Sequence, residues 1–505
     1  MLTVTLERLR ALTDSELVAG PASTEVRGLA DDSRHVQPGD LFFCMPGAKV
    51  DGARFAADAV EQGAVAVVVP EGTQPPPGVP ALRAADCRAA LSCAVREMAR
   101  EAIGRLTYAG VTGTNGKTTT TCLTAAVLRA AGRRTAIVGT LGTLREDGSR
   151  VASKNTTPGP LDLLHQIEAL AGEGYTHLAM EVSSQAVVQH RADFLPFAAA
   201  VWTNLSPEHF ELHGDLDTYR AVKVRYLAEA SAAAKADGRP FAAVVNLDDP
   251  SAPQFLAAIG YGTVYGFTMG APVVSSFSGE RVEGREGSSG LTGGRVIARW
   301  RDQRAEIRLQ LGGGFNLQNA LAAACVGLSQ GIDLATSARG LAGVERVPGR
   351  FQPVPSEKRQ VLIDYAHTSE GMENLLKACR PLVAQGGRLI VVFGCGGDRD
   401  NSKRPRMGRS AAAYADFCVI TNDNPRTEDP ARITGHILEG IDGGDRARCV
   451  VEHDRRRAIG IALEKASPHD LVVVAGKGHE DYQLVGDRVL HFDDYEVVKE
   501  TLERL

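Results

Sequence analysis

The chain has 505 residues, a formal net charge of −5, 44% hydrophobic residues and 23% charged residues. That length exceeds what one hydrophobic core supports, so we expect several domains, and the weak negative charge excludes a general polyanion-binding surface and disfavours nucleic acid as a partner. The nine cysteines form no Cys-x-x-Cys pair, no signal-peptide pattern opens the chain and no apolar run reaches membrane-spanning length, so we expect a cytoplasmic protein without disulfides or membrane insertion.

The first segment alternates strand-like and helix-like patterns. We expect a helix over residues 53–62, a strand over 64–69 and a helix over 89–102, with a Pro/Gly-rich loop over 70–80. This alternation is typical of a small α/β domain, which we place at residues 1–102. Ser33, in Asp32-Ser-Arg34, would on its own be a helix-cap or turn serine.

A Gly-rich stretch then carries the most specific pattern of the chain. A β-prone run ends in Thr112-Gly-Thr-Asn-Gly-Lys-Thr-Thr119, and a helix-prone segment covers residues 117–131. In this context backbone N–H groups cradle phosphates, Lys117 reaches their outer oxygens and Thr118 offers a hydroxyl to Mg²⁺. The strict phosphate-loop pattern has glycine where this chain has Val111, so a Gly-rich turn with a surface lysine is the alternative.

Further features of residues 103–346, the expected central domain, suit a triphosphate. Asn155-Thr-Thr-Pro158 could hold an anion or merely cap a helix. Glu181 ends a β-prone run, where nucleotide enzymes hold Mg²⁺. A loop containing His209, which could be an ordinary loop histidine, leads into a helix with Lys223. A helix from Gly314 carries two amides that could pack beside a nucleobase.

The remaining residues, 347–505, indicate a third domain. Apolar β-branched runs at 360–364, 388–393, 416–421 and 470–475 are separated by helical patterns, which predicts a parallel sheet. Polar loops follow three of these runs, at the carboxyl ends of strands where open α/β sheets bind ligands. The loops are Gly394-Cys-Gly-Gly-Asp-Arg-Asp400, Asn422-Asp-Asn-Pro-Arg426 and Gly476-Lys-Gly-His-Glu480.

In their order and spacing these motifs resemble the Mur ligase family of ATP-dependent peptide-bond-forming enzymes. The resemblance implies an α/β fold with three domains: an N-terminal one for a uridine nucleotide, a central P-loop ATPase and a C-terminal Rossmann-like domain that brings the amino acid. The motifs that carry it are Thr112–Thr119, Glu181-Val-Ser-Ser184, Thr203-Asn-Leu-Ser206 with His209, Tyr219 to Lys223, Asn316-Leu-Gln-Asn319, Val347-Pro-Gly-Arg350 and Asp364-Tyr-Ala-His367.

Asp423-Asn-Pro-Arg426 is similar to the motif of family members that add meso-diaminopimelate. This amino acid has a second carboxylate, which a guanidinium can grip with two charge-assisted hydrogen bonds, whereas lysine presents a cation that Arg426 would repel. The resemblance therefore implies a ligase that adds meso-diaminopimelate to the D-glutamate γ-carboxylate of UDP-N-acetylmuramoyl-L-alanyl-D-glutamate. It further implies an acyl phosphate made from ATP, in peptidoglycan precursor synthesis.

The resemblance also assigns residues to roles. The expected catalytic residues are Lys117, Glu181, His209, Lys223 and Arg350. The residues expected to bind ATP are Gly113, Thr114, Asn115, Gly116, Lys117, Thr118, Thr119, Thr120, Asn316, Asn319 and Asp364. Those expected to bind the uridine-nucleotide substrate are Ser33, Ala48, Lys49, Val50, Asn155, Thr156, Thr157, Ser183, Gln189 and Arg191. Those expected to bind diaminopimelate are Arg399, Asp423, Asn424, Pro425, Arg426, Gly476 and Glu480.

Two Mg²⁺ ions are expected by the same resemblance. One would lie on Thr118 and Glu181. The other would lie on His209, Glu181 and Lys223, whose ammonium must first be carbamylated by CO₂ because a cation cannot ligate a metal. We expect a monomer whose partners are small molecules.

Three alternatives stay open. A lysine-adding ligase, or a ligase acting on the next peptide, should lack Asp423-Asn-Pro-Arg426. Folylpolyglutamate synthase would share the phosphate loop and not the first domain. A binding or scaffold protein without turnover would have no chemical reason to keep Lys117, Glu181, His209 and Lys223 together.

Overall fold

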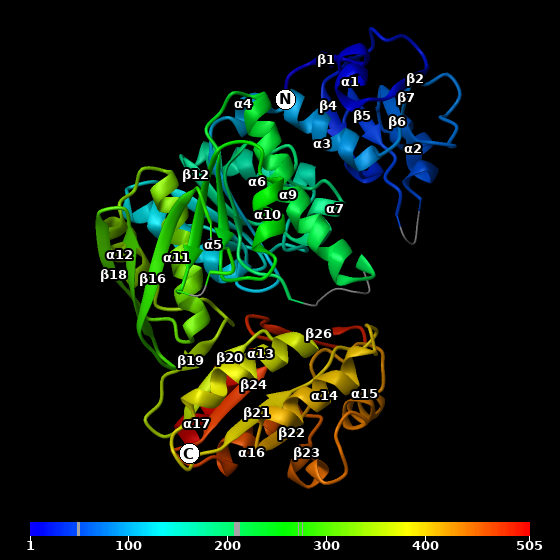
Figure 1. Cartoon of the computed structure of the whole chain (residues 1–505). Coiled ribbons are helices and arrows are strands. Elements are labelled where there is room, and N and C mark those ends of the chain that lie inside the picture. Colours follow the sequence, from blue (N-terminus) through cyan, green and yellow to red (C-terminus); the bar gives the residue numbers. More distant parts are fainter. Residues whose placement is uncertain (48–50, 207–212, 271, 275) are drawn as a thin grey trace.

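The computed structural model describes residues 1–47, 51–206, 213–270, 272–274 and 276–505. Three α/β units follow one another along the chain, each built on its own sheet (Figure 1). The first unit, in blue, lies beside the large central unit, and the third, in yellow to red, lies below the central unit in this view. The expected three-domain α/β architecture is confirmed. The boundaries near residues 103 and 347 remain a prediction.

The first unit contains a five-stranded sheet in the order β2-β7-β6-β5-β4. Strands β4 to β7 are parallel, and their apolar runs are buried because α1 and α3 cover one face and α2 covers the other. The bounds are β1 Val4–Thr5, α1 Leu6–Thr13, β2 Glu16–Ala19, β3 Glu25–Val26, β4 Gly28–Ala30, β5 Asp40–Phe43, α2 Ala56–Glu61, β6 Ala66–Pro70, β7 Ala81–Ala84, α3 Cys87–Met98 and α4 Arg100–Ile103, with 3₁₀ turns Ser33–His35 and Gly52–Phe55.

The central unit is organised around an eleven-stranded sheet in the order β11-β10-β9-β12-β8-β13-β14-β15-β16-β17-β18. The strands from β9 to β16 in this order are parallel, and antiparallel strands extend both edges. Helices α5, α11 and α12 pack on one face, and α6, α7 and α9 on the other. The neighbouring carboxyl ends of β8, β12 and β13 therefore meet at one edge, where open sheets bind ligands.

The bounds of the central elements are β8 Thr107–Thr112, α5 Lys117–Ala130, β9 Thr135–Gly139, β10 Gly142–Leu144, β11 Arg150–Val151, α6 Pro160–Gly172, β12 His177–Glu181, α7 Ser184–Val188, β13 Phe197–Trp202, α9 Leu216–Ala236, β14 Ala242–Asn246, α10 Ala252–Ala258, β15 Thr263–Thr268, β16 Glu280–Ser289, β17 Gly294–Trp300, β18 Gln303–Leu309, α11 Gly314–Ser329 and α12 Leu334–Ala342. Val111 is a fully buried residue of β8. The strand thus continues through the position where the strict phosphate-loop pattern has glycine.

The third unit has a six-stranded sheet in the order β19-β20-β24-β21-β22-β23, parallel except for β19. Helices α13, α14 and α15 cover one face, and α16 and α17 cover the other. The bounds are β19 Gln352–Val354, β20 Gln360–Asp364, α13 Ser369–Cys379, β21 Leu389–Phe393, α14 Lys403–Tyr414, β22 Phe417–Ile420, α15 Pro430–Leu438, β23 Cys449–Val451, α16 Arg455–Lys465, β24 Leu471–Ala475, β25 Tyr482–Val485, β26 Arg488–His491 and α17 Asp494–Arg504, with 3₁₀ turns Arg380–Leu382 and Asp445–Arg448. All four predicted strands are present.

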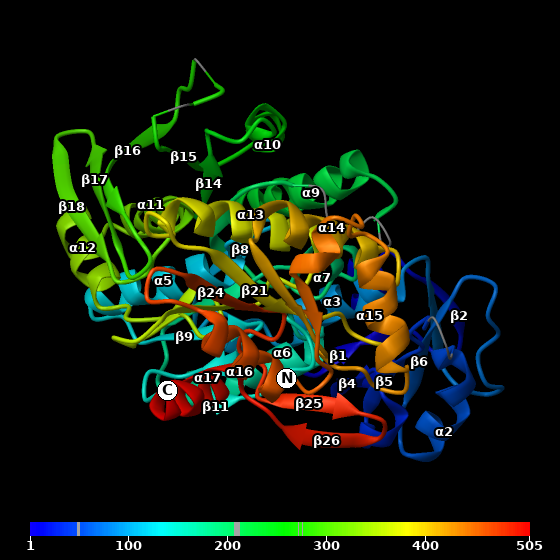
Figure 2. The ribbon, with the colours of Figure 1, turned by 90° about the horizontal axis from the view of Figure 1, so that it is seen from below.

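A hairpin of β25 and β26 projects beyond the sheet of the third unit (Figure 2). It is anchored where Arg426 N donates to Leu484 O at 3.0 Å and Gly486 N donates to Arg426 O at 2.7 Å. The hairpin therefore supports one of the predicted amino-acid loops.

None of the helices in the described ranges combines the length and apolar character needed to traverse a bilayer.

Candidate active site

The phosphate loop links the end of β8 to the start of α5. Gly113 and Gly116 have φ angles of 148° and 84°, which residues with a Cβ rarely adopt. A Cβ on Gly113 would lie 1.9 Å from Thr203 Oγ1, so only glycine fits there. Asn204, after β13, holds the loop from outside, since Thr114 N donates to Asn204 O at 3.0 Å and Asn115 N donates to Asn204 Oδ1 at 2.9 Å. The loop shape is thus set by its surroundings, as an anion-binding backbone requires.

Lys117 lies over this loop, where its Nζ donates to Gly113 O at 2.9 Å and to Thr114 O at 2.8 Å. Lys223, on α9, is fully buried and donates from Nζ to the same Gly113 carbonyl at 2.9 Å. Its Nζ also lies 4.5 Å from the ring centroid of Tyr219. Two lysines that are far apart in the chain therefore converge on one loop.

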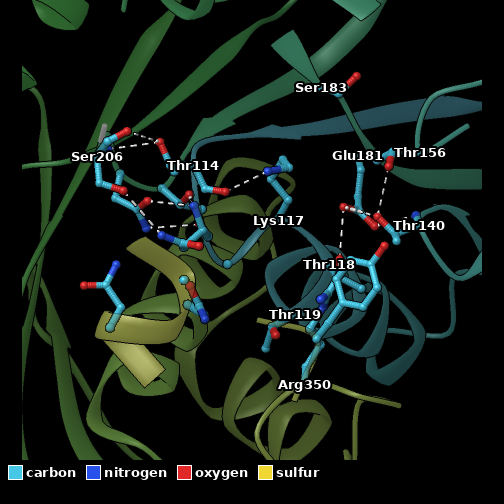
Figure 3. Close-up of a pocket in the computed structure, with 18 of the residues that line it drawn as sticks. Thr114, Lys117, Thr118, Thr119, Thr140, Thr156, Glu181, Ser183, Ser206 and Arg350 are labelled. Carbon is cyan, nitrogen blue, oxygen red and sulfur yellow. Dashed lines mark hydrogen bonds between the residues drawn. The ribbon is translucent and has the colours of Figure 1, made fainter. Parts of the chain in front are cut away.

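Glu181 ends β12 and is only 1% exposed. Its carboxylate accepts hydrogen bonds from Thr118 Oγ1 at 3.0 Å, from Thr140 N at 2.8 Å and from Thr140 Oγ1 at 3.2 Å. Figure 3 shows Thr118, Thr140 and Thr156 gathered around this carboxylate. A buried carboxylate beside a threonine hydroxyl supplies the hard oxygen donors that Mg²⁺ prefers, so these residues fit such an ion.

His209, expected beside Glu181, lies outside the described residues, and so do Ala48, Lys49 and Val50. Among the residues that the structure does describe, no group of at least three His, Cys, Asp or Glu side chains is placed to hold a metal. The expected second Mg²⁺ site is thus described only at Glu181 and Lys223.

Arg350 joins the central unit to the third unit. Its NH2 donates to Thr118 Oγ1 at 3.2 Å, and its guanidinium carbon lies 4.5 Å from the ring centroid of Tyr365. Asp364 fixes the same junction by accepting from Phe351 N at 2.7 Å and Ala366 N at 2.9 Å. Burial raises the pKa of Asp364, and the positive charge of Arg350 opposes that rise. A cation from the junction is therefore held against the phosphate loop.

On α11, Asn316 and Asn319 form a fixed pair of amides. Asn319 Nδ2 donates to Asn316 Oδ1 at 2.9 Å, and Asn319 Oδ1 accepts from Thr120 Oγ1 at 3.2 Å. A Cβ on Gly116 would lie 2.5 Å from Asn319 Oδ1, so α11 packs directly on the phosphate loop.

A cavity of about 790 Å³ gathers most of the predicted nucleotide and substrate residues. Its lining includes Thr114, Asn115, Gly116, Lys117, Thr118, Thr119, Asn155, Thr156, Glu181, Ser183, Arg191, Lys223, Asn316, Asn319, Arg350 and Asp364. Gly113, Thr120, Thr157 and Gln189 are not part of this lining, and Ser33 lies in the first unit.

Three of the predicted substrate residues form one network beside the cavity. Arg191 donates from Nε to Gln189 Oε1 at 3.0 Å and from NH1 to Thr157 O at 2.9 Å. Thr157 Oγ1 in turn donates to Glu181 O at 2.9 Å. The residues that do not line the cavity thus hold Arg191 in place within it.

A second cavity, of about 710 Å³, lies at the carboxyl ends of the third sheet. Asn424 Nδ2 donates to Glu480 Oε2 at 2.9 Å, and the fully buried Lys477 donates to the same oxygen at 3.0 Å. Tyr365, His367, Thr368 and Lys154 line both cavities, so the two adjoin. The predicted residues in its lining are Arg399, Asp423, Asn424, Arg426, Gly476 and Glu480, and Pro425 lies outside it.

Several residues in or next to these cavities were not predicted from the sequence. Thr140, which donates twice to Glu181, follows β9 and carries no motif of its own. Lys477 donates to Glu480 and His367 lines both cavities, and both belong to motifs in which other residues carried the predicted roles. Lys154 adjoins the Asn155 loop and adds a cation where the two cavities meet.

Comparison with known proteins gives matches along most of the chain. Family models match the Mur ligase family, catalytic domain at residues 25–102, the Mur ligase middle domain at 111–327 and the Mur ligase, glutamate ligase domain at 349–478.

Two similar curated proteins are both named UDP-N-acetylmuramoyl-L-alanyl-D-glutamate--2,6-diaminopimelate ligase. One, from Syntrophomonas wolfei subsp. wolfei, is 41% identical over 98% of this chain and 98% of its own length. The other, from Solibacter usitatus, is 42% identical over 95% of this chain and 94% of its own length. A solved structure of a ligase with the same name matches with a TM-score of 0.68 and 29% identity, covering 100% of this chain and 99% of that one.

Proposed function

This chain belongs to the Mur ligase family, and from that premise we propose that it adds meso-diaminopimelate to UDP-N-acetylmuramoyl-L-alanyl-D-glutamate in an ATP-dependent reaction. The observation that carries the proposal is the pair of adjoining cavities, one around a phosphate loop and one around Asp423-Asn-Pro-Arg426. Two curated relatives that match nearly the whole chain carry the name of that ligase. The reaction supplies a peptidoglycan precursor.

ATP binds in the first cavity in this proposal. Backbone N–H groups of residues 113–119 hold its phosphates, and Lys117 and Arg350 place positive charge beside the transferred γ-phosphoryl group. Asn316 and Asn319 would meet the adenosine half of ATP, and the junction residue Asp364 lines the same cavity. The contacts that support these roles are those of Asn319 with Thr120 and of Arg350 with Thr118.

The proposed reaction has two steps. The γ-carboxylate oxygen of D-glutamate attacks the γ-phosphorus of ATP, so that an acyl phosphate forms and ADP leaves. The amino nitrogen of diaminopimelate then attacks the acyl carbon, and the tetrahedral intermediate expels phosphate as the amine loses a proton. Because both reactants are anionic, the cations around the site lower the barrier by offsetting their charge.

Thr118 and Glu181 would hold one Mg²⁺. His209, Glu181 and a carbamylated Lys223 would hold a second. Bound Mg²⁺ would neutralise the phosphate charge. Carbamylation joins the Lys223 nitrogen to the carbon of CO₂ with loss of a proton, and it needs a neutral amine. Lys223 is fully buried beside the phosphate loop, and its carbamate would keep an N–H that can donate to Gly113 O.

Diaminopimelate occupies the second cavity in the same proposal. Arg426 and Arg399 offer guanidinium groups to its carboxylates, and Glu480 offers a carboxylate to its distal ammonium. Lys477 and Asn424 already donate to Glu480 Oε2, which orients the carboxylate. Lysine lacks the second carboxylate, so its binding would leave Arg426 without an anion. Asp423, Pro425 and Gly476 shape the loops around these groups.

The uridine nucleotide is proposed to run from the first unit into the first cavity. Ser33 and residues 48–50 would meet the uridine end, and Asn155, Thr156, Thr157, Ser183, Gln189 and Arg191 would meet the diphosphate, muramoyl and peptide parts. Burial lowers the pKa of Arg191, with the nearby Arg88 acting in the same direction. An anionic substrate group beside Arg191 would relieve both effects. A monomeric state and a cytoplasmic location remain predictions.

The test is phosphate release from ATP by the purified protein with UDP-N-acetylmuramoyl-L-alanyl-D-glutamate and either meso-diaminopimelate or L-lysine. Arg426→Ala should lose turnover with diaminopimelate, and Arg409→Ala, on the exposed face of α14, should keep it. Turnover with lysine instead would support ligase activity and refute the role of Arg426 in selecting diaminopimelate. Turnover with neither amino acid would favour a folate ligase or a protein without catalysis.

A further inference from the structure

An ion pair between a buried arginine and a partly exposed glutamate lies next to residues that line the second cavity. Arg404, on α14, is fully buried, and its NH1 and NH2 donate to Glu428 Oε1 and Oε2 at 2.7 Å each. NH2 also donates to Gly396 O at 3.1 Å. Neither Arg404 nor Glu428 lines the cavity. The attraction between two such charges often does not offset the free energy needed to remove them from water. The pair is therefore better explained by the residues that it positions than by a gain in stability.

The pair joins the two loops that carry the proposed diaminopimelate-binding arginines. Gly396 belongs to the loop of Arg399, and Glu428 follows Arg426 by two residues. Glu428 Oε2 also accepts from Asp398 N at 3.0 Å, so one carboxylate grips both the helix and the first loop. The Arg404 guanidinium holds the pKa of Glu428 at about 2, so the carboxylate stays charged well into the acidic range.

Further hydrogen bonds join these two loops directly. Gly397 N donates to Asn424 O at 2.9 Å, and Arg426 NH1 donates to Gly397 O at 2.9 Å. Asp398 Oδ2 accepts from Thr427 N at 3.0 Å and from Thr427 Oγ1 at 2.9 Å. A Cβ on Gly397 would lie 1.9 Å from Pro425 O, so the approach requires glycine.

The backbone at two of these positions is strained. Asp398 and Arg426 have φ angles of 53° and 52°, in the left-handed region that side-chain-bearing residues seldom occupy. Such conformations persist only where the surroundings impose them. At Asp398 the surroundings are the hydrogen bonds with Glu428 and Thr427. At Arg426 they are the backbone hydrogen bonds with Leu484 and Gly486 of the hairpin.

We propose that Arg404 and Glu428 are positioning residues that fix Arg399 and Arg426 relative to each other, and so set the affinity of the second cavity for the dicarboxylic amino acid. This inference rests on the proposed function. It predicts that losing the pair weakens diaminopimelate binding and leaves the first cavity intact.

The experiment uses the full-length protein with Arg404→Met and Glu428→Gln, and Asp470→Asn as the matched control. Asp470 is also buried and paired to an arginine, accepting from Arg388 NH2 at 2.7 Å, but it lies at the amino ends of β21 and β24. Burial alone would raise the pKa of Asp470, but Arg388 and backbone N–H groups lower it to about 2, as Arg404 does for Glu428. The arginine is the more exposed partner in this control pair. The double variant Arg404→Met/Glu428→Leu avoids a lone buried charge should a single variant fold poorly.

The readouts are KM for meso-diaminopimelate, KM for ATP, and hydroxamate formation when hydroxylamine replaces the amino acid as acceptor of the acyl group. We expect KM for diaminopimelate to rise about tenfold to hundredfold in the Arg404 and Glu428 variants, since displacements of about 1 Å have effects of that size. KM for ATP and hydroxamate formation should stay within about twofold of wild type, which a general loss of folding would not allow.

An unchanged KM for diaminopimelate in any folded variant of the pair, or an equal rise in Asp470→Asn, would overturn the inference and leave the proposed function standing. A wild-type protein that does not use diaminopimelate at all would instead overturn the proposed function, and the inference with it.

Discussion

Gly116→Ala tests whether the phosphate loop and α11 form one site. A Cβ at this position lies 2.5 Å from Asn319 Oδ1, and the φ angle of 84° is left-handed. The left-handed conformation costs roughly 1–2 kcal/mol for a residue with a Cβ. Displacing Asn319 also disrupts its hydrogen bonds with Thr120 and Asn316, each with a net contribution of about 1 kcal/mol. The total loss in the free energy of unfolding is therefore about 3–4 kcal/mol.

Gly132→Ala provides the control. Gly132 has a φ angle of 74° and nothing within 4 Å of an added Cβ, so this variant carries the conformational cost alone. Both substitutions alter the unfolded chain alike, so that effect cancels in the comparison. The difference between the two variants, about 2 kcal/mol, isolates the contact with Asn319.

The assay is urea denaturation followed by tryptophan fluorescence. The chain has two tryptophans, Trp202 and Trp300, and both belong to the central sheet, so the signal reports the unit that contains Gly116. KM for ATP should rise in Gly116→Ala and stay unchanged in Gly132→Ala. Equal stability and equal KM in the two variants would refute the packing of Asn319 against the loop as a feature of the nucleotide site.

Three further predictions concern single residues. Lys223→Ala should lose most phosphate release and regain part of it with added acetate, because a short carboxylate can replace the carbamate; full activity without acetate would end that proposal. Glu181→Gln should lower phosphate release by about 100-fold or more at an unchanged melting temperature, since an isosteric amide lacks the charge; near-normal turnover would contradict the role of the carboxylate. His479→Gln should remove a pH dependence of stability, because burial, together with Arg350 and other nearby cations, lowers the pKa of His479 to about 3.

The sign of the His479 effect follows from proton uptake. The unfolded chain binds a proton at His479 below about pH 6.5, whereas the folded chain does not until about pH 3. Between pH 7 and pH 5 the free energy of unfolding of the wild type should therefore fall by about 1–2 kcal/mol more than that of the variant. Equal falls in urea titrations at the two pH values would contradict the burial of a neutral imidazole.

Local patterns were enough to predict much of the fold. The phosphate loop depends on glycines that are adjacent in sequence, and the third sheet depends on four β-branched runs, so both could be recognised without tertiary information. The antiparallel strands β16 to β18 were not predicted, although residues 303–309 alternate charged and apolar side chains as a half-exposed strand does. The β25 and β26 hairpin did carry a signal, a Gly486-Asp487 pair between two strand-like runs.

The residues of the candidate site also differ in whether the sequence predicts them, depending on whether they belong to a motif. Lys117, Glu181 and Arg426 were found because each sits in a recognisable motif. Thr140 and Arg404 were not, since their partners, Glu181 and Glu428, lie 41 and 24 residues away in the chain and only the fold brings them together. Complete burial of Lys223 likewise depends on how α9 packs against the phosphate loop.

The measurement that tests the central claim most directly is mass spectrometry of the nucleotide product after incubation with ATP, UDP-N-acetylmuramoyl-L-alanyl-D-glutamate and equal amounts of meso-diaminopimelate and L-lysine. We predict a single product, the substrate extended by one diaminopimelate residue, with stoichiometric release of phosphate. A lysine-extended product, or an unchanged nucleotide while ATP is consumed, would contradict the account.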